Sequence, residues 1–127
     1  MVYKPYNQNE GSACTVCFFE YSQGKYPVSE FIDSILQKKL RAKVLRTIEL
    51  LEMYDGLLRL PYSRHLRDGI FELRIRYGTD SVRILYFFKE QNKAVLTNGF
   101  TKKGNRTPEE EITKAIRYRD MDRERER

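Results

Sequence analysis

The sequence predicts an α+β protein in which a small antiparallel β-sheet has its helices packed on one face. Three observations predict this class. A β-rich apolar segment lies near the start, at 14–21. A stretch without glycine or proline, typical of helices, follows from Ser29 to Tyr54. Three β-type segments and a proline-started helical segment then occupy Gly69 to Arg119. The predicted order is β-α-α-β-β-β-α.

The length and composition indicate one domain with two short ends. The chain has 127 residues, of which 40% are hydrophobic, enough for a single small core. Residues 1–13 are polar without periodicity, so we predict a flexible N-terminal extension there. Residues 14–119 are predicted to form the folded domain. Residues 120–127 alternate in charge and are predicted to form a frayed, charged tail.

Charge and hydropathy restrict the function. Lys4 and Pro5 occur where a signal peptide needs apolar residues, and no apolar run reaches membrane-spanning length. We therefore expect a cytoplasmic protein without a membrane partner. A net charge of +6 and a pI near 9.4 favour a polyanionic partner, either nucleic acid or an acidic protein.

Cys14 and Cys17 form an isolated C-x-x-C motif. A structural zinc site needs about four ligands, and the chain has one histidine, His65. Redox cysteine pairs usually stand at the start of a helix, whereas these two lie in a predicted strand. We therefore predict structural thiols and no metal site.

The predicted first strand at 14–21 is followed by a turn at 22–27 that contains Gly24 and Pro27. Ser29 is the predicted N-cap of the helical stretch. A single helix to Tyr54 would be roughly 39 Å long, too long for this domain. We therefore predict two helices with a bend near Gln37.

The second helix has one apolar stripe and one basic face. The stripe predicts packing against the sheet, and it comprises Leu40, Val44, Ile48 and Leu51. The basic face comprises Lys38, Lys39, Arg41, Lys43 and Arg46. It is interpreted either as an ordinary solvated face or as a surface towards RNA or the ribosome.

Three strands are predicted after a loop at 57–68. Residues 70–77 alternate between apolar and charged side chains, which indicates a strand with one buried face. Residues 81–89 are apolar on both faces, which indicates a central strand. Residues 93–103 form the last strand, where Gly99 indicates a bulge or a close approach.

The final helix has strong start signals. Thr107 is a predicted cap, Pro108 suits the first position, and acids at 109–111 favour the positive end of the helix dipole. Ile112 and Ala115 begin an apolar stripe.

Several lysine and arginine side chains lie on predicted strands that otherwise have the apolar composition of a core. Burying them costs stability unless they meet an anion, and we predict that the anion is RNA phosphate. RNA supplies its own nucleophile, the 2′-hydroxyl, so arginine and lysine can stabilise the developing charge without a metal. A lysine crowded by cations has a lowered pKa and could act as the base. The alternative from charge alone is a basic surface that binds an acidic protein.

Four motifs, in this order and spacing, point to a family. They are Glu72-Leu73-Arg74, Arg83-Ile84-Leu85-Tyr86-Phe87, Gly99-Phe100-Thr101-Lys102-Lys103, and Thr107-Pro108 with Glu111-Ile112 and Ala115. Over about 14–119, the chain resembles the HigB-like branch of the RelE/ParE toxin superfamily. This branch includes phage-derived host-growth inhibitors, and the resemblance implies a RelE-like fold for the domain.

The resemblance implies the toxin of a type II toxin–antitoxin system. Such a toxin is a ribosome-dependent mRNA endonuclease, or mRNA interferase, that inhibits translation without a metal or other cofactor. Its implied partners are the ribosome, mRNA and a helix-turn-helix antitoxin that neutralises it. Two alternatives stay open on the same fold, namely a ParE-like gyrase inhibitor and a non-enzymatic interaction module.

The resemblance also implies roles for individual residues. Arg83 matches the central-strand arginine that contacts the scissile phosphate, and Arg74 matches a basic position on the neighbouring strand. With Lys102, these are the expected catalytic residues. The expected RNA-binding residues are Arg76, Tyr86, Lys103 and Arg106, with the alternative that Tyr86 is a core tyrosine. The C-terminal catalytic tyrosine of some relatives has no counterpart at 109–112, since Tyr118 lies further on, and the histidines that other relatives use near the last strand are absent from this sequence.

Overall fold

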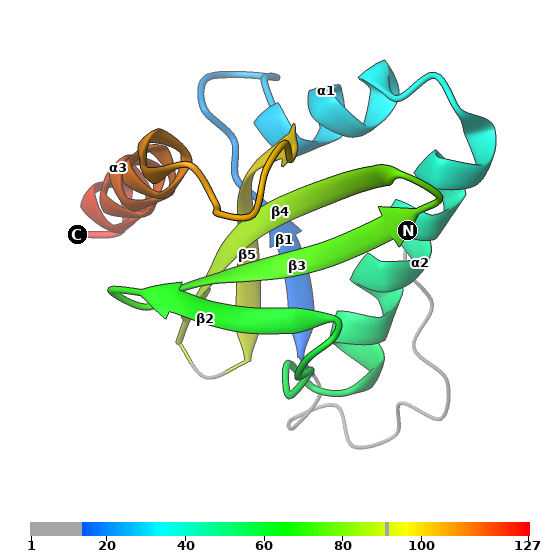
Figure 1. Ribbon diagram of the computed structural model, residues 1–127. Helices are drawn as coiled ribbons and strands as arrows, with labels where there is room; N and C mark the ends of the chain where they lie inside the picture. The colour runs from blue at the N-terminus through cyan, green and yellow to red at the C-terminus, as the bar shows by residue number, and fades with distance from the viewer. Residues whose placement is uncertain (1–13, 91) are drawn as a thin grey trace.

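A computed structural model of the protein describes residues 14–90 and 92–127. The predicted flexible extension at 1–13 lies outside the described residues. Within them, five strands form one sheet in the order β1-β5-β4-β3-β2 (Figure 1). The elements are β1 (Thr15–Phe18), α1 (Pro27–Ser34), α2 (Lys38–Met53), β2 (Ser63–Arg67), β3 (Ile70–Tyr77), β4 (Asp80–Lys89), β5 (Lys93–Thr101) and α3 (Glu109–Arg125).

The α+β class and the central position of β4 are confirmed. Two details of the predicted sheet are wrong. The sheet is mixed rather than antiparallel, because β1 pairs parallel with β5. The predicted loop at 57–68 also contains β2, which pairs antiparallel with β3 at the edge of the sheet. Since an edge strand is only partly covered, the sequence of β2 lacks the apolar alternation that identifies a strand.

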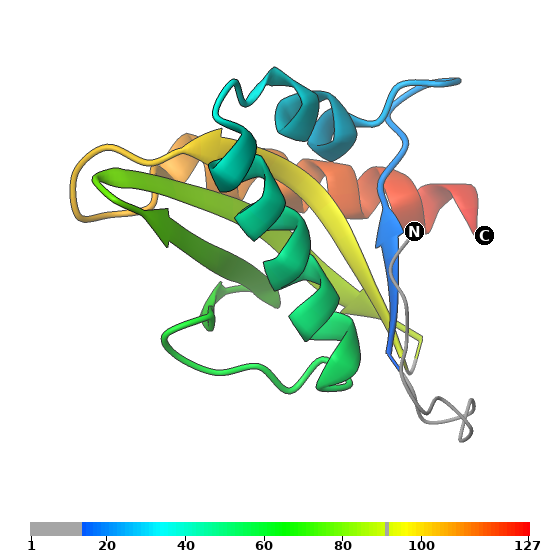
Figure 2. The same cartoon turned by 90° about the vertical axis from the view of Figure 1, so that its right-hand side faces the viewer.

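The helices cover both faces of the sheet, so the prediction of one covered face is wrong (Figure 2). Buried residues of α1 and α2, such as Val28 and Val44, share a core with Leu73 of β3. On the opposite face, Ile112 of α3 packs in a second core with Leu85 of β4. The apolar character of β4 on both sides therefore reflects burial from both faces.

The predicted bend near Gln37 is confirmed, because α1 ends at Ser34 and α2 begins at Lys38. The predicted N-cap at Ser29 is wrong. The N-cap position is Tyr26, three residues earlier, and the helix begins at Pro27, whose fixed φ suits the first helical turn and which has no N–H to satisfy.

The start and the end of α3 also differ from the predictions. Thr107 does not cap the helix, since its hydroxyl donates to Glu72 and the N-cap position is Pro108. The predicted fraying from residue 120 is wrong, because α3 continues to Arg125. The Arg125 guanidinium donates to the carbonyl oxygens of Glu20 and Tyr21 at 2.6 and 2.7 Å, which holds this end against the body of the protein.

Gly99 marks a close approach between β5 and α1. A Cβ atom at this position would lie 2.6 Å from Cδ2 of Phe31, well inside van der Waals contact. The bulge in β5 falls two residues earlier, where Thr97 is the extra residue between the paired positions 96 and 98. The prediction for Gly99 is therefore confirmed as a close approach.

Gly99→Ala is expected to lower the free energy of unfolding by about 1–3 kcal/mol, because the new methyl group overpacks the space against Phe31. Urea unfolding followed by circular dichroism measures this change. Phe31→Leu in the Gly99→Ala background should recover part of the loss. Equal stability of Gly99→Ala and the wild type would contradict the close approach.

Candidate phosphate-binding site

A cluster of charged side chains lies on the face of the sheet that α3 covers in part. Leu73 and Ile84 point into the core beneath α1 and α2. Because side chains alternate along a strand, Glu72 and Arg74 of β3 and Arg83 of β4 point to the opposite face. Arg74 and Arg83 are direct neighbours across the two strands. Like charges in this position repel each other, so the cluster needs a counter-charge.

Glu72 supplies that counter-charge from a fully buried position, at 0% exposure. Its Oε2 lies 3.1 Å from Nη2 of Arg64 and 3.2 Å from Nη1 of Arg74. Its Oε1 accepts a hydrogen bond from Thr107 at 2.6 Å and lies 3.5 Å from Nε of Arg83. One carboxylate thus contacts guanidinium groups from β2, β3 and β4.

Arg83 is buried at 3% exposure, which is unusual for a cation. Its Nη1 donates to Oγ of Ser81 at 2.8 Å and to the carbonyl of Val82 at 3.1 Å. Among the described residues, its Nε has no hydrogen-bond partner. Burial lowers the pKa of Arg83, and the negative charge of Glu72 acts in the opposite direction. The single carboxylate does not balance the arginines around it, so the cluster suits an additional anion.

Lys102 joins the cluster from the end of β5. Its backbone N–H donates to the carbonyl of Ser81 at 2.7 Å, which extends the pairing of β4 and β5 past Thr101. Its Nζ donates to the carbonyl of Asn105 at 2.7 Å. Partial burial, followed by the charge of Arg83, lowers the pKa of Lys102. Lys102 is therefore easier to deprotonate than an ordinary lysine.

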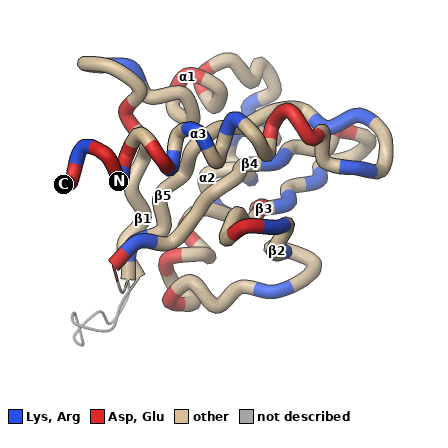
Figure 3. The backbone as a smooth tube through the Cα atoms, turned by 90° about the vertical axis from the view of Figure 1, so that its left-hand side faces the viewer, with Lys and Arg blue, Asp and Glu red and all other residues tan. Residues whose placement is uncertain are grey.

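A cavity of about 240 Å³ adjoins the cluster. Figure 3 shows basic positions of β3 and of the loop between β5 and α3 at the same end of the molecule. The residues that line the cavity come from α2, the following loop and the two strands: Lys43, Thr47, Pro61, Tyr62, Arg74, Ile75, Arg76 and Arg83. The surroundings of the cavity are strongly cationic.

The structure brings the three predicted catalytic residues close enough to interact electrostatically. Arg74 and Arg83 both pair with Glu72, and the charge of Arg83 acts on Lys102. Arg76 is exposed and lines the adjacent cavity. Two further predicted RNA-binding residues, Lys103 and Arg106, are exposed on the loop that leads to α3.

The predicted RNA-stacking role of Tyr86 does not fit its position. Tyr86 is 1% exposed and its ring stacks on Phe71, with centroids 5.5 Å apart. Its hydroxyl shares a hydrogen bond of 2.5 Å with Ser63, and burial raises its pKa to about 12. A base could not reach this ring without opening the core, so Tyr86 is the core tyrosine of the alternative interpretation.

Three members of the cluster were missed by the sequence interpretation. Glu72 lies in one of the family motifs without a predicted role, Arg64 lies in a predicted loop, and Thr107 is a predicted helix cap. A signal existed for Glu72, because strand alternation puts it on the same face as Arg74. Arg64 and Thr107 carry no such local signal, since β2 and the loop before α3 reach Glu72 through tertiary structure.

Tyr118 and His65 lie in structural environments. Tyr118 is 9% exposed and stacks on Phe19, with ring centroids 4.7 Å apart. His65 contacts the edge of Phe71 at 4.9 Å between centroids. Among the described residues, no group of three or more His, Cys, Asp or Glu side chains is arranged to hold a metal ion.

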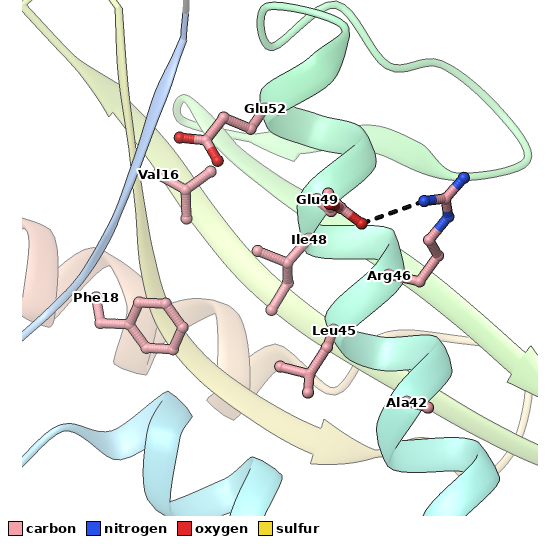
Figure 4. A pocket seen from close by; sticks show the side chains of 8 residues that line it. All are labelled: Val16, Phe18, Ala42, Leu45, Arg46, Ile48, Glu49 and Glu52. Carbon is pink, nitrogen blue, oxygen red and sulfur yellow. Dashed lines mark hydrogen bonds and ion pairs between the residues drawn. The ribbon is translucent and has the colours of Figure 1, made fainter. Parts of the chain in front are cut away.

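A larger hollow of about 540 Å³ lies between β1 and α2. Figure 4 shows Val16 and Phe18 of β1 on one side and Leu45 and Ile48 of α2 on the other. Glu49, paired with Arg46 at 3.2 Å, and Glu52 also line it. An apolar groove with carboxylates disfavours a phosphate, so this hollow is not the candidate site.

Comparison with known proteins identifies one family. The model of the family described as "Phage derived protein Gp49-like (DUF891)" matches residues 30–120. The match covers more than half of the chain and includes Glu72 and the basic residues around it. No curated protein matches the chain.

None of the helices within 14–90 and 92–127 is long and apolar enough to cross a membrane.

Proposed function

Because this chain belongs to the phage-derived Gp49-like family, a family of RelE/HigB-like toxins in toxin–antitoxin systems, we propose that it is a type II toxin that cleaves mRNA in the ribosome. Translation stops when the message is cut. The observation that carries the proposal is the grouping of Arg64, Arg74 and Arg83 around one carboxylate, with Lys102 beside them.

The cluster is better suited to catalysis on an RNA phosphate than to binding the charged surface of an acidic protein. Arg83 comes from a rigid central strand and is held by Ser81 and Val82, so its position does not depend on a flexible loop. Donors fixed in a partly dry site stabilise developing phosphate charge more strongly than donors in water. A surface that only binds an acidic protein gains little from burying an arginine to this extent.

In the proposed reaction, the 2′-oxygen of the RNA attacks the neighbouring phosphorus to form a 2′,3′-cyclic phosphate, and the bond to the 5′-oxygen breaks. The departing 5′-oxygen takes a proton from water and leaves as a 5′-hydroxyl. Arg83 and Arg74 stabilise the charge that develops on the phosphate oxygens. Lys102 in its neutral form accepts the proton of the 2′-hydroxyl, and its lowered pKa increases the population of this form. Arg76, Lys103 and Arg106 contact the RNA backbone and position it.

The proposed antitoxin is a helix-turn-helix protein with an acidic segment. Such a segment would neutralise the toxin by competing with RNA for the cationic cluster, and salt would weaken both interactions.

The first test is induction of the chain alone in bacterial cells, with mapping of mRNA 5′ ends. We expect new ends within translated codons. A reporter mRNA that differs only in lacking its ribosome-binding site and start codon is the matched control and should stay intact. Growth arrest with whole mRNA and damaged DNA would support the gyrase alternative instead. Soluble protein without growth arrest would support a non-enzymatic module.

The pH dependence of cleavage tests the role of Lys102. The neutral amine is the active form, so the rate should rise with pH and level off below the ordinary lysine pKa. Lys102→Arg keeps the charge but cannot release its proton. It is expected to remove the pH-dependent rise and to reduce the rate by about 10²- to 10⁴-fold. Single-turnover cleavage on programmed ribosomes measures both, and an unchanged pH profile in Lys102→Arg would exclude Lys102 as the base.

A further inference from the structure

Glu72 is fully buried, and each of its two carboxylate oxygens contacts different residues of the candidate site. Its Oε2 faces Arg64 and Arg74, and its Oε1 faces Arg83 and Thr107. The partners belong to different strands and, for Thr107, to the loop that leads to α3.

On the assumption that the proposed nuclease function is correct, we infer that Glu72 is the positioning residue of the active site. Before RNA binds, it orients Arg74 through a hydrogen bond and supplies the counter-charge of the buried Arg83. Through Thr107 it holds the loop that carries Lys102. Glu72 itself does not touch the reacting atoms. The inferred role is geometric preorganisation of the donors that stabilise phosphate charge.

Stability alone is a weak reason to keep this carboxylate. Removing a carboxylate and guanidinium groups from water carries a desolvation cost that their attraction often fails to recover. Apolar residues in place of both Glu72 and Arg83 would extend the neighbouring core of Leu85 and Ile112 without that cost. A functional requirement for oriented arginines explains the buried charge better than packing does.

The hydrogen bond from Thr107 adds a second link. It joins Oγ1 of Thr107 to Glu72 at 2.6 Å across 35 positions of sequence. Lys102 lies five residues before Thr107, and its Nζ is held by the carbonyl of Asn105 in the same loop. Movement at Thr107 would therefore displace the lysine relative to the arginines.

The positioning role predicts that loss of the Glu72 charge lowers turnover without weakening RNA binding. Glu72→Gln keeps the shape of the side chain and removes its negative charge. Arg74 and Arg83 then lose the negative charge that attracts them, and the site becomes more cationic. We expect turnover on programmed ribosomes to fall about 10²-fold, while KM stays equal or falls. A purely structural role would instead lower activity only in proportion to the folded fraction, measured by thermal melting of the same sample.

Thr107→Val provides a second variant in case Glu72→Gln does not fold. It keeps the volume of the side chain and removes the hydroxyl, so turnover should fall while Thr107→Ser restores it. Turnover equal to wild type in folded Glu72→Gln or in Thr107→Val would overturn the inference, with the nuclease function intact.

A measurement without catalysis separates the two hypotheses. The ¹⁵N-detected NMR signal of the Arg74 Nη–H groups reports how firmly that guanidinium is held, because Nη1 of Arg74 donates to Oε2 of Glu72 at 3.2 Å. Inorganic phosphate is the probe of binding. We expect a protected signal in the wild type and loss of protection in Glu72→Gln. If the wild type cleaves no RNA, the proposed function fails. The positioning role fails if the Arg74 signal is equally protected in both proteins.

Discussion

Arg83→Met is expected to abolish most cleavage while leaving the fold intact. The loss should be about 10²- to 10³-fold in turnover, the range for removing one preorganised charge stabiliser. Methionine fills much of the volume that the arginine stem occupies, so packing is largely kept. Glu72 remains contacted by Arg64, Arg74 and Thr107, so the substitution does not leave an uncompensated carboxylate.

Arg83→Met also removes the cost of burying a charged guanidinium. The free energy of unfolding of this variant should therefore stay within about 1.5 kcal/mol of that of the wild type. Arg123→Met is the matched control, because Arg123 is exposed near the end of α3, far along the chain from the cluster. Turnover on programmed ribosomes and urea unfolding are measured on all three proteins. Full activity in a folded Arg83→Met protein would contradict the assignment of Arg83 to catalysis.

Leu73→Ala is expected to destabilise the protein by about 2–5 kcal/mol, the largest stability effect that we predict. Leu73 is 0% exposed and lies between the sheet and α2, in the core that contains Val44 and Ile48. Truncation removes apolar contacts and leaves a cavity, because the strand is held in register on both sides.

Leu36→Ala is the control for Leu73→Ala, since Leu36 is 91% exposed after the end of α1. Its effect should stay within about 0.5 kcal/mol. Urea unfolding of the two variants measures the difference. Similar small effects for both would mean that the side chains of β3 point opposite to the described arrangement, which would also move Glu72 and Arg74 away from the site.

The strands and helices with strong local patterns were predictable. Alternation along 70–77 determined which side chains of β3 are buried, and the apolar run at 81–89 determined that β4 is central. The break between α1 and α2 followed from helix length. In each case neighbouring residues carry the information, since a period of two or of 3.6 is a property of the local chain.

Pairings between distant segments were not predictable in the same way. The parallel pairing of Thr15 with Lys93 joins segments that are far apart in the sequence, and nothing in either segment specifies the other. β2 is an edge strand, and its polar residues resemble a loop. Thr107 has the composition of a helix cap, but a buried carboxylate competes for its hydroxyl.

The candidate site also has features that follow from the local sequence and features that depend on tertiary structure. The sequence by itself determined which face of β3 carries Arg74, and family resemblance directed attention to Arg83 and Lys102. Only the tertiary structure decided that Glu72 contacts both Arg74 and Arg83 and that Tyr86 is enclosed in the core. The physical reason is that a salt bridge needs side-chain atoms within about 4 Å. That distance depends on the register of three strands and on the path of the loop before α3, neither of which is encoded by local periodicity.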